Sequence, residues 1–174
     1  MAGEQRPALD EETIAFAGRV FQMARAGDTA ALGDLLAQGM PANLRNDKGD
    51  SLLMLASYNG HAEATRLLLA HGGDTALAND RGQTPLLGAA FKGDLAVALA
   101  LLEGGAEVDA AGQDGRTALM LAAMFDRAEM VTLLLGRGAD RHARDANGAT
   151  AEELAAAMGA QATPGLLRAA SQRG

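Results

Sequence analysis

Apolar side chains recur along the chain at the spacing of amphipathic helices, and short polar segments that contain glycine separate them. Three successive segments carry this pattern: Ala64, Leu67 and Leu68; Val97, Leu101 and Leu102; and Met130, Leu133, Leu134 and Leu135. The spacing predicts three helices that begin at His61, Asp94 and Arg127 and bury one face each. These helices are expected to end at left-handed glycine caps, at Gly72, Gly105 and Gly138.

Four sets of residues repeat along the chain with a period of 33. They are Gly39, Gly72, Gly105 and Gly138; Gly49, Gly82, Gly115 and Gly148; Ser51, Thr84, Thr117 and Thr150; and Ala56, Ala89, Ala122 and Ala155. Four sets in phase predict a stacked repeat architecture. Because a short helix cannot hide its apolar face alone, successive units must pack against one another.

The polar turns predict where the first helix of each unit begins. The N-cap candidates are Ser51, Thr84, Thr117 and Thr150, whose hydroxyl groups can accept from the free amides of the first turn. Pro85 follows Thr84 at the first helical position, where a missing N–H costs nothing. Thr150 and Glu153 have the spacing of a capping box. A first helix is therefore expected over about 84–92, with glycines ending the first helices at Gly60 and Gly93.

The stretches DRGQTPLLGAA, DGRTALMLAA and LLLGRGAD resemble the ankyrin repeat, whose usual pattern is D-x-x-G-x-T-P-L-H-x-A-A, then G-H, then L-L-L-x-x-G-A-D. The resemblance implies an all-α ankyrin-repeat α-solenoid of about five stacked helix-turn-helix units joined by hairpin loops. It assigns full repeats to 46–78, 79–111 and 112–144, an N-terminal capping repeat to 13–45, a C-terminal capping repeat to 145–174 and a flexible leader to 1–12. In place of the pattern's histidine stand Met54, Leu87 and Met120, which make the first-helix layer more apolar.

Composition restricts the partners. The 174 residues include 15 Lys and Arg against 22 Asp and Glu, a net charge of −7, so nucleic acid is not the expected partner. No apolar run approaches the roughly 18 residues of a membrane span, and no membrane partner is expected. The chain has no cysteine, which excludes disulfides and fits a cytoplasmic protein. Chains of this kind are similar to small bacterial ankyrin repeat proteins.

Residues typical of catalytic and metal sites are scarce. No two of His61, His71 and His142 have the spacing of a helical metal pair, and structural or solvated roles are expected for all three. No serine lies in a G-x-S-x-G elbow, and the glycine pairs follow helices rather than precede them, so they cannot cradle a phosphate. We therefore expect no enzyme activity, no cofactor and no metal site.

The resemblance implies that a protein partner binds the concave face formed by the hairpin tips and the first helices. Candidate contacts at the tips are the charged residues Asp47, Lys48, Asp80, Arg81, Asp114 and Arg116. Candidate anchors at the ends of the first helices are Tyr58, Phe91, Met124 and Phe125. Stacking would align these anchors into an apolar ladder, and aromatic and Met side chains are enriched in interface centres.

Other interpretations of these residues stay open. The rings can instead pack against neighbouring repeats, and the tip charges can simply face solvent. The favoured function is a non-catalytic protein-protein interaction module that is monomeric. One alternative is a structural protein that self-associates, as a homodimer, through the ladder. Another is a small-ligand binder or an enzyme with an unrecognised site, although the sequence offers no converging polar side chains for it.

Overall fold

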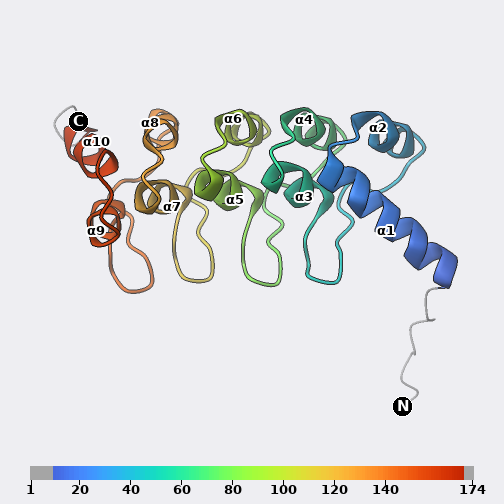
Figure 1. The fold of residues 1–174 in the computed structure, drawn as a ribbon, viewed down its shortest axis with the longest axis horizontal. Coiled ribbons are helices and arrows are strands. Elements are labelled where there is room, and N and C mark those ends of the chain that lie inside the picture. Colours follow the sequence, from blue (N-terminus) through green and yellow to red (C-terminus); the bar gives the residue numbers. More distant parts are fainter. Residues whose placement is uncertain (1–9, 171–174) are drawn as a thin grey trace, which may run out of the picture.

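A computed structural model describes residues 10–170 as a row of short helices (Figure 1). They are α1 (Glu11–Ala26), α2 (Thr29–Ala37), α3 (Leu52–Tyr58), α4 (Ala62–Ala70), α5 (Pro85–Lys92), α6 (Leu95–Glu103), α7 (Ala118–Met124), α8 (Ala128–Gly136), α9 (Ala151–Ala157) and α10 (Thr163–Ala170). Within the described range the only β pairing is an isolated bridge between Arg45 and Ser51. The all-α solenoid expected from the sequence is confirmed.

The helices form two layers along one elongated body (Figure 1). Helices α3, α5, α7 and α9 make the first-helix layer, and α2, α4, α6 and α8 make the second-helix layer. Neighbours within each layer contact one another, so each unit covers the apolar face of the next. The loops between units project as hairpins beyond the first helices, and α10 packs on α8 and α9 at the C-terminal end.

Small and aliphatic side chains fill the core. The alanines of the first helices are fully buried at Ala56, Ala89, Ala122 and Ala155. Their small side chains let adjacent first helices approach closely. Leucines at the same period fill the second-helix layer at Leu68, Leu101 and Leu134 and continue at Leu167 in α10. Met54, Leu87 and Met120, which replace the histidine of the family pattern, are also buried.

Three of the four predicted N-caps form as expected. The hydroxyl of Ser51 accepts from the Met54 amide at 3.1 Å, and that of Thr117 accepts from the Met120 amide at 3.4 Å. At Thr150 the capping box is complete, because Glu153 also accepts from the Thr150 amide at 2.8 Å. Thr84 occupies the N-cap position of α5, but its side chain makes no cap hydrogen bond, so that part of the prediction is wrong.

The two ends of the chain differ in how far they are described. Residues 1–9 of the expected leader 1–12 lie outside the described part, whereas Glu11 and Glu12 belong to the first turn of α1. The carboxylate of Asp10 caps this helix by accepting from the Thr13 amide at 2.7 Å. At the other end, α10 runs through Pro164, and residues 171–174 are outside the described range.

Candidate functional site

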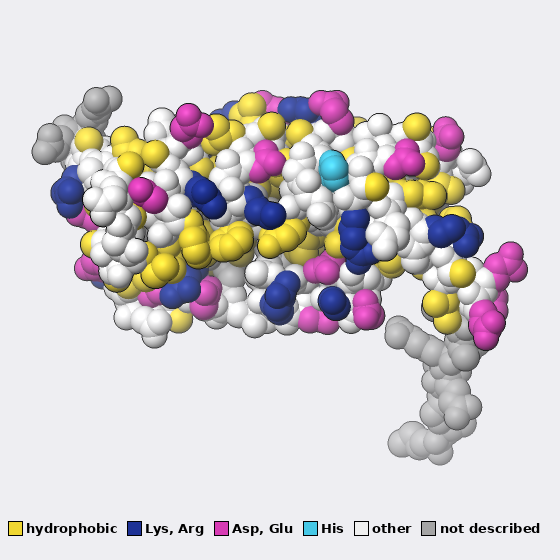
Figure 2. Space-filling view, in the orientation of Figure 1, with side chains coloured by type: hydrophobic (Ala, Val, Ile, Leu, Met, Phe, Trp, Pro, Cys, Tyr) yellow, Lys and Arg dark blue, Asp and Glu magenta, His cyan; other side chains and the backbone are white. Residues whose placement is uncertain are grey.

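Large apolar side chains are exposed in a row at the ends of the first helices. Tyr58 ends α3, Phe91 lies in the last turn of α5, Phe125 caps α7 and Met158 caps α9. The exposed fractions are 45% for Tyr58, 38% for Phe91 and 38% for Phe125. We call these four residues the apolar stripe. On the face seen in Figure 2, a hydrophobic band runs along the body with Lys and Arg side chains on both sides.

The rings of the stripe contact their neighbours without being buried by them. Phe91 and Phe125 pair edge to face, with centroids 4.7 Å apart and an interplanar angle of 79°. The ammonium group of Lys92 lies 4.7 Å from the centroid of the Tyr58 ring, which is a cation–π contact. The aromatic residues of the stripe therefore contact their neighbours and still leave more than a third of their surface exposed.

The sequence predicted part of this stripe, but it included Met124 and missed Met158. Met124 is in register with Tyr58 and Phe91 at the period of 33, but it is half-buried, and the adjacent Phe125 takes the exposed place. Met158 is 55% exposed and was not among the predicted contacts. A signal was present, because Met158 follows Phe125 by 33 residues.

The predicted tip residues are exposed, with one exception. Asp47, Lys48, Asp80, Arg81 and Asp114 face solvent, and Arg116 is half-buried. Within residues 10–170, neither Lys48 nor Arg81 lies within ion-pair distance of a carboxylate, whereas Asp80 pairs weakly with Arg45 at 4.0 Å. The structure therefore leaves Lys48 and Arg81 available to a partner.

Arg116 has a structural role as well. Its Nη1 lies 3.5 Å from Oδ2 of Asp114 on its own tip, and its Nε lies 3.6 Å from Oδ2 of Asp145 on the next tip. The Asp145 carboxylate accepts from the amides of Ala149 and Asn147, both at 2.9 Å. These amides, the Ala149 amide most strongly, hold the pKa of Asp145 below its ordinary value, and the Arg116 charge adds to the effect. Arg116 thus links two hairpins.

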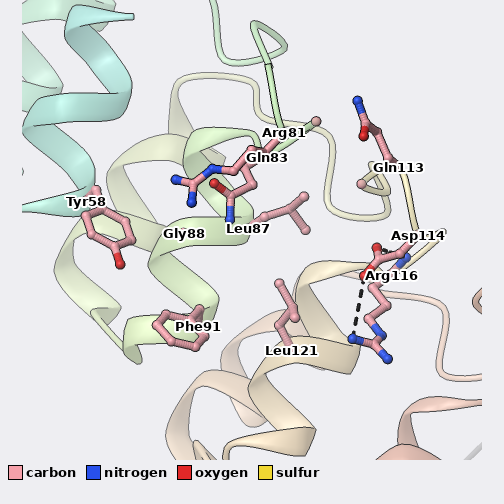
Figure 3. A pocket seen from close by; sticks show the side chains of 12 residues that line it. Tyr58, Arg81, Gln83, Leu87, Gly88, Phe91, Gln113, Asp114, Arg116 and Leu121 are labelled. Carbon is pink, nitrogen blue, oxygen red and sulfur yellow. Dashed lines mark hydrogen bonds and ion pairs between the residues drawn. The ribbon is translucent and has the colours of Figure 1, made fainter. Parts of the chain in front are cut away.

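A hollow of ≈ 520 Å³ opens between the stripe and the tips (Figure 3). The rings of Tyr58 and Phe91 border it on the helix side, and Leu87 and Leu121 line it from α5 and α7. The tips contribute polar side chains on the opposite side, at Arg81, Gln83, Gln113, Asp114 and Arg116. Five of the ten predicted contacts therefore line this hollow: Tyr58, Phe91, Arg81, Asp114 and Arg116. Phe125 is not among the lining residues, but it contacts Phe91 edge to face.

Gly88 also lines the hollow, and the sequence analysis did not single it out. Leucines stand 33 positions before it and 33 and 66 positions after it, which gives the series Leu55, Gly88, Leu121 and Leu154. A Cβ atom at position 88 would lie 3.2 Å from Cδ2 of Tyr58, so a leucine there would project against that ring. Glycine inside a helix costs about 1 kcal/mol relative to alanine.

The histidines lie in structural or solvent-exposed positions, as the sequence suggested. His61 shares a 2.8 Å hydrogen bond with the carbonyl of Arg25 in the preceding unit, and His71 shares one with the carbonyl of Leu67 at 3.0 Å. His142 accepts from the neighbouring Arg141. In the described part of the chain, no three His, Cys, Asp or Glu side chains gather as a metal site would require. No helix within residues 10–170 has the length and apolar character needed to cross a bilayer.

Comparison with known proteins agrees with this architecture. The family described as ankyrin repeats (3 copies) matches the chain over residues 20–111 and again over 88–171. A protein of Pseudomonas aeruginosa strain PAO1, described as an ankyrin repeat protein, is 57% identical over 67 residues. The matched segment is 38% of this chain and 39% of that relative, so the similarity spans about two fifths of the curated protein. Since the family matches extend over most of the chain, the protein belongs to the ankyrin repeat family.

Proposed function

We propose that this protein is a non-catalytic interaction module whose protein partner binds the concave face, across the first helices and the hairpin tips. Ankyrin repeats are in general protein-protein interaction modules. The observation that carries the proposal is the apolar stripe, in which three aligned rings stay more than a third exposed. Leaving such a side chain uncovered forgoes part of the ~1.5–3 kcal/mol that full burial would contribute, so an aligned set favours a surface that a partner covers.

The tip residues complete this surface. Lys48 and Arg81 are exposed and unpaired within the described residues, so they can steer an approaching partner and select among partners. Asp47 and Asp114 provide charges of the opposite sign on the same tips. Arg116 contributes less to selection, because two carboxylates of this chain already engage it.

The sequence supports two further features of the proposal. The net charge of −7 argues against nucleic acid as the partner, and the absence of cysteine fits a protein of the bacterial cytoplasm. We also propose that the free protein is a monomer. The rival possibility is self-association, because a second copy could cover the apolar stripe as well as a partner does.

Affinity purification with the triple variant Tyr58→Ala, Phe91→Ala and Phe125→Ala tests the proposal. The wild-type chain and the variant serve as baits in extract of the native host, and a double variant Ile14→Ala and Phe16→Ala is the matched control. Ile14 and Phe16 are also exposed apolar residues, but they lie on α1 away from the stripe. We expect the triple variant to fold and to lose a protein that the control retains.

Two results would contradict this function. A triple variant that no longer folds would mean that the rings support the core. A triple variant that keeps every partner of the wild-type chain would mean that the stripe is not the contact. Measurement of the molecular mass in solution distinguishes partner binding from self-association. A wild-type dimer that the triple change dissociates would mean that the stripe binds a second copy of the chain.

A further inference from the structure

The hollow over Gly88 has the shape and chemistry to select one kind of side chain, and this inference rests on the proposed function. Leucines occupy the equivalent positions of three other units, at Leu55, Leu121 and Leu154. At Gly88 the edge of the Tyr58 ring takes part of the space of the missing side chain, and the rest opens into the hollow as a gap beside the glycine. Apolar atoms of Leu87 and Leu121 line the hollow beside it, and the rings of Tyr58 and Phe91 stand at its rim (Figure 3).

The opposite wall of the hollow is polar and belongs to two hairpin tips. Gln83 lies on one tip and Gln113 on the next, and both line the hollow. Gly112 also lines it, at the position where other tips carry Asn46, Asn79 and Asp145. A polar wall that includes two amide side chains, opposite an apolar wall, suits a peptide segment, whose backbone can bond to the amides while one side chain enters the gap.

The charges around the hollow are mostly positive, although the whole chain is acidic. Arg81 lines the hollow, Lys92 lies against the Tyr58 ring, and Arg127 donates through Nε to the carbonyl of Phe91 at 3.3 Å. Arg116 also lines the hollow, but Asp114 and Asp145 already pair with it. The acidic groups nearby are engaged: Asp114 pairs with Arg116, Asp80 pairs with Arg45, and Asp126 accepts from amides at the start of α10.

We propose that the hollow binds an acidic peptide segment of the partner and takes one leucine-sized apolar side chain into the gap over Gly88. The cations at the rim pair with carboxylates that flank this side chain. A basic segment is repelled, and a segment with only polar side chains leaves the gap unfilled.

Selection from a random peptide display library tests the inference with the folded chain as bait. We expect enriched sequences that carry Leu, Ile or Met flanked by Asp or Glu. The most enriched sequence is then made as a labelled synthetic peptide, and its affinity for the folded chain is measured by titration. Replacing its apolar residue by Ala should weaken binding about tenfold or more, which corresponds to the lost burial of one aliphatic side chain. Raising the salt concentration should weaken it further.

Two variants of the protein locate the site. Gly88→Leu places a side chain against the Tyr58 ring and in the gap, and it should abolish peptide binding. Gly136→Leu is the matched control, since Gly136 ends α8 with open space beside it. The double change Lys92→Glu and Arg127→Glu should reverse the preference toward basic peptides. Its control is Arg66→Glu with Arg137→Glu, which alters the total charge equally but acts on the second-helix layer and the turn after it. If Gly88→Leu does not fold, the inference is tested by the peptide preference of the charge-reversed variant and by the loss of affinity when the apolar residue of the peptide is replaced by Ala.

Several results would overturn the inference. Enrichment of basic or purely polar peptides, enrichment of none, or full binding by Gly88→Leu each excludes it. Tighter binding of a single-stranded oligonucleotide, lost in the Lys92 and Arg127 variant, would assign the cations to phosphates instead. If peptides are selected whose binding needs the stripe but tolerates Gly88→Leu, the inference fails while the proposed function stands. If the triple alanine variant binds every partner normally, the proposed function fails too.

Discussion

Asp126 and Thr163 join the last two units of the repeat. The carboxylate of Asp126 accepts from the backbone amide of Thr163 at 2.9 Å and from its hydroxyl at 3.1 Å. It also accepts from the amides of Gln161 and Ala162, so one side chain of the fourth unit caps the N-terminus of α10. Asp126 does this with φ at 53°, in a series where the other units carry Gly27, Gly60, Gly93 and Gly159. Asp126 therefore adopts a left-handed conformation that favours glycine, and its side chain provides the cap that a glycine could not.

The first prediction concerns this cap. Asp126→Ala should lower the melting temperature by several degrees, because it removes the acceptor for three amides and keeps an unfavourable backbone angle. Asp126→Gly removes the same acceptor but relieves the backbone, so its melting temperature should lie between those of the wild type and the alanine variant. Hydrogen exchange should show the loss of protection concentrated in α10. Equal protection of α10 in all three proteins would exclude the cap.

The second prediction concerns how the stability of the fold depends on pH. The amide of Thr163, then that of Gln161, holds the pKa of Asp126 below its ordinary value of 3.8. A carboxyl group with a lowered pKa in the folded state stabilises the fold at pH values above 3.8, and that contribution is lost as the pH falls through the lowered pKa. Urea unfolding of the wild type and of Asp126→Asn, compared from about pH 6 down to about pH 2, should therefore converge at the acid end. A difference that stays constant with pH would contradict the assignment.

The third prediction compares two buried threonines at equivalent positions. Thr117 caps α7 through its hydroxyl, whereas Thr84 makes no side-chain cap at the start of α5. Thr117→Val should therefore lower the free energy of unfolding by about 1 kcal/mol, the usual value of an N-cap. Thr84→Val is isosteric and matched in burial, and we expect a change within about 0.5 kcal/mol. Denaturant titration of both variants measures the two values, and equal losses would refute the distinction.

The fourth prediction separates the core from the stripe. Leu101 is fully buried in α6, so Leu101→Ala should cost about 2–5 kcal/mol in unfolding free energy. Phe125 keeps 38% of its surface exposed, so Phe125→Ala should cost less, chiefly the edge-to-face contact with Phe91 of about 0.5–1.5 kcal/mol and the burial that remains. Chemical denaturation ranks the two. A larger loss at Phe125 would show that the ring belongs to the core.

Much of the site could be predicted from the repeat period. Tyr58 and Phe91 follow from counting 33 positions along the chain, and Met158 could have been found in the same way from Phe125. Gly88 could have been noticed as the one interruption in a series of leucines. The half-burial of Met124 could not be anticipated, because it depends on how the last turn of α7 packs rather than on register.

The sequence by itself determined the local structure and its repetition. Caps such as Ser51, left-handed turns such as Gly82 and the helical spacing of leucines act within a few residues, where chain chemistry is sufficient to specify the outcome. Only the tertiary structure decided which of the aligned side chains stay exposed, that Asp126 reaches α10 and that a hollow opens over Gly88. Each of these depends on contacts between residues about 33 or more positions apart, and such contacts exist only once neighbouring units have packed.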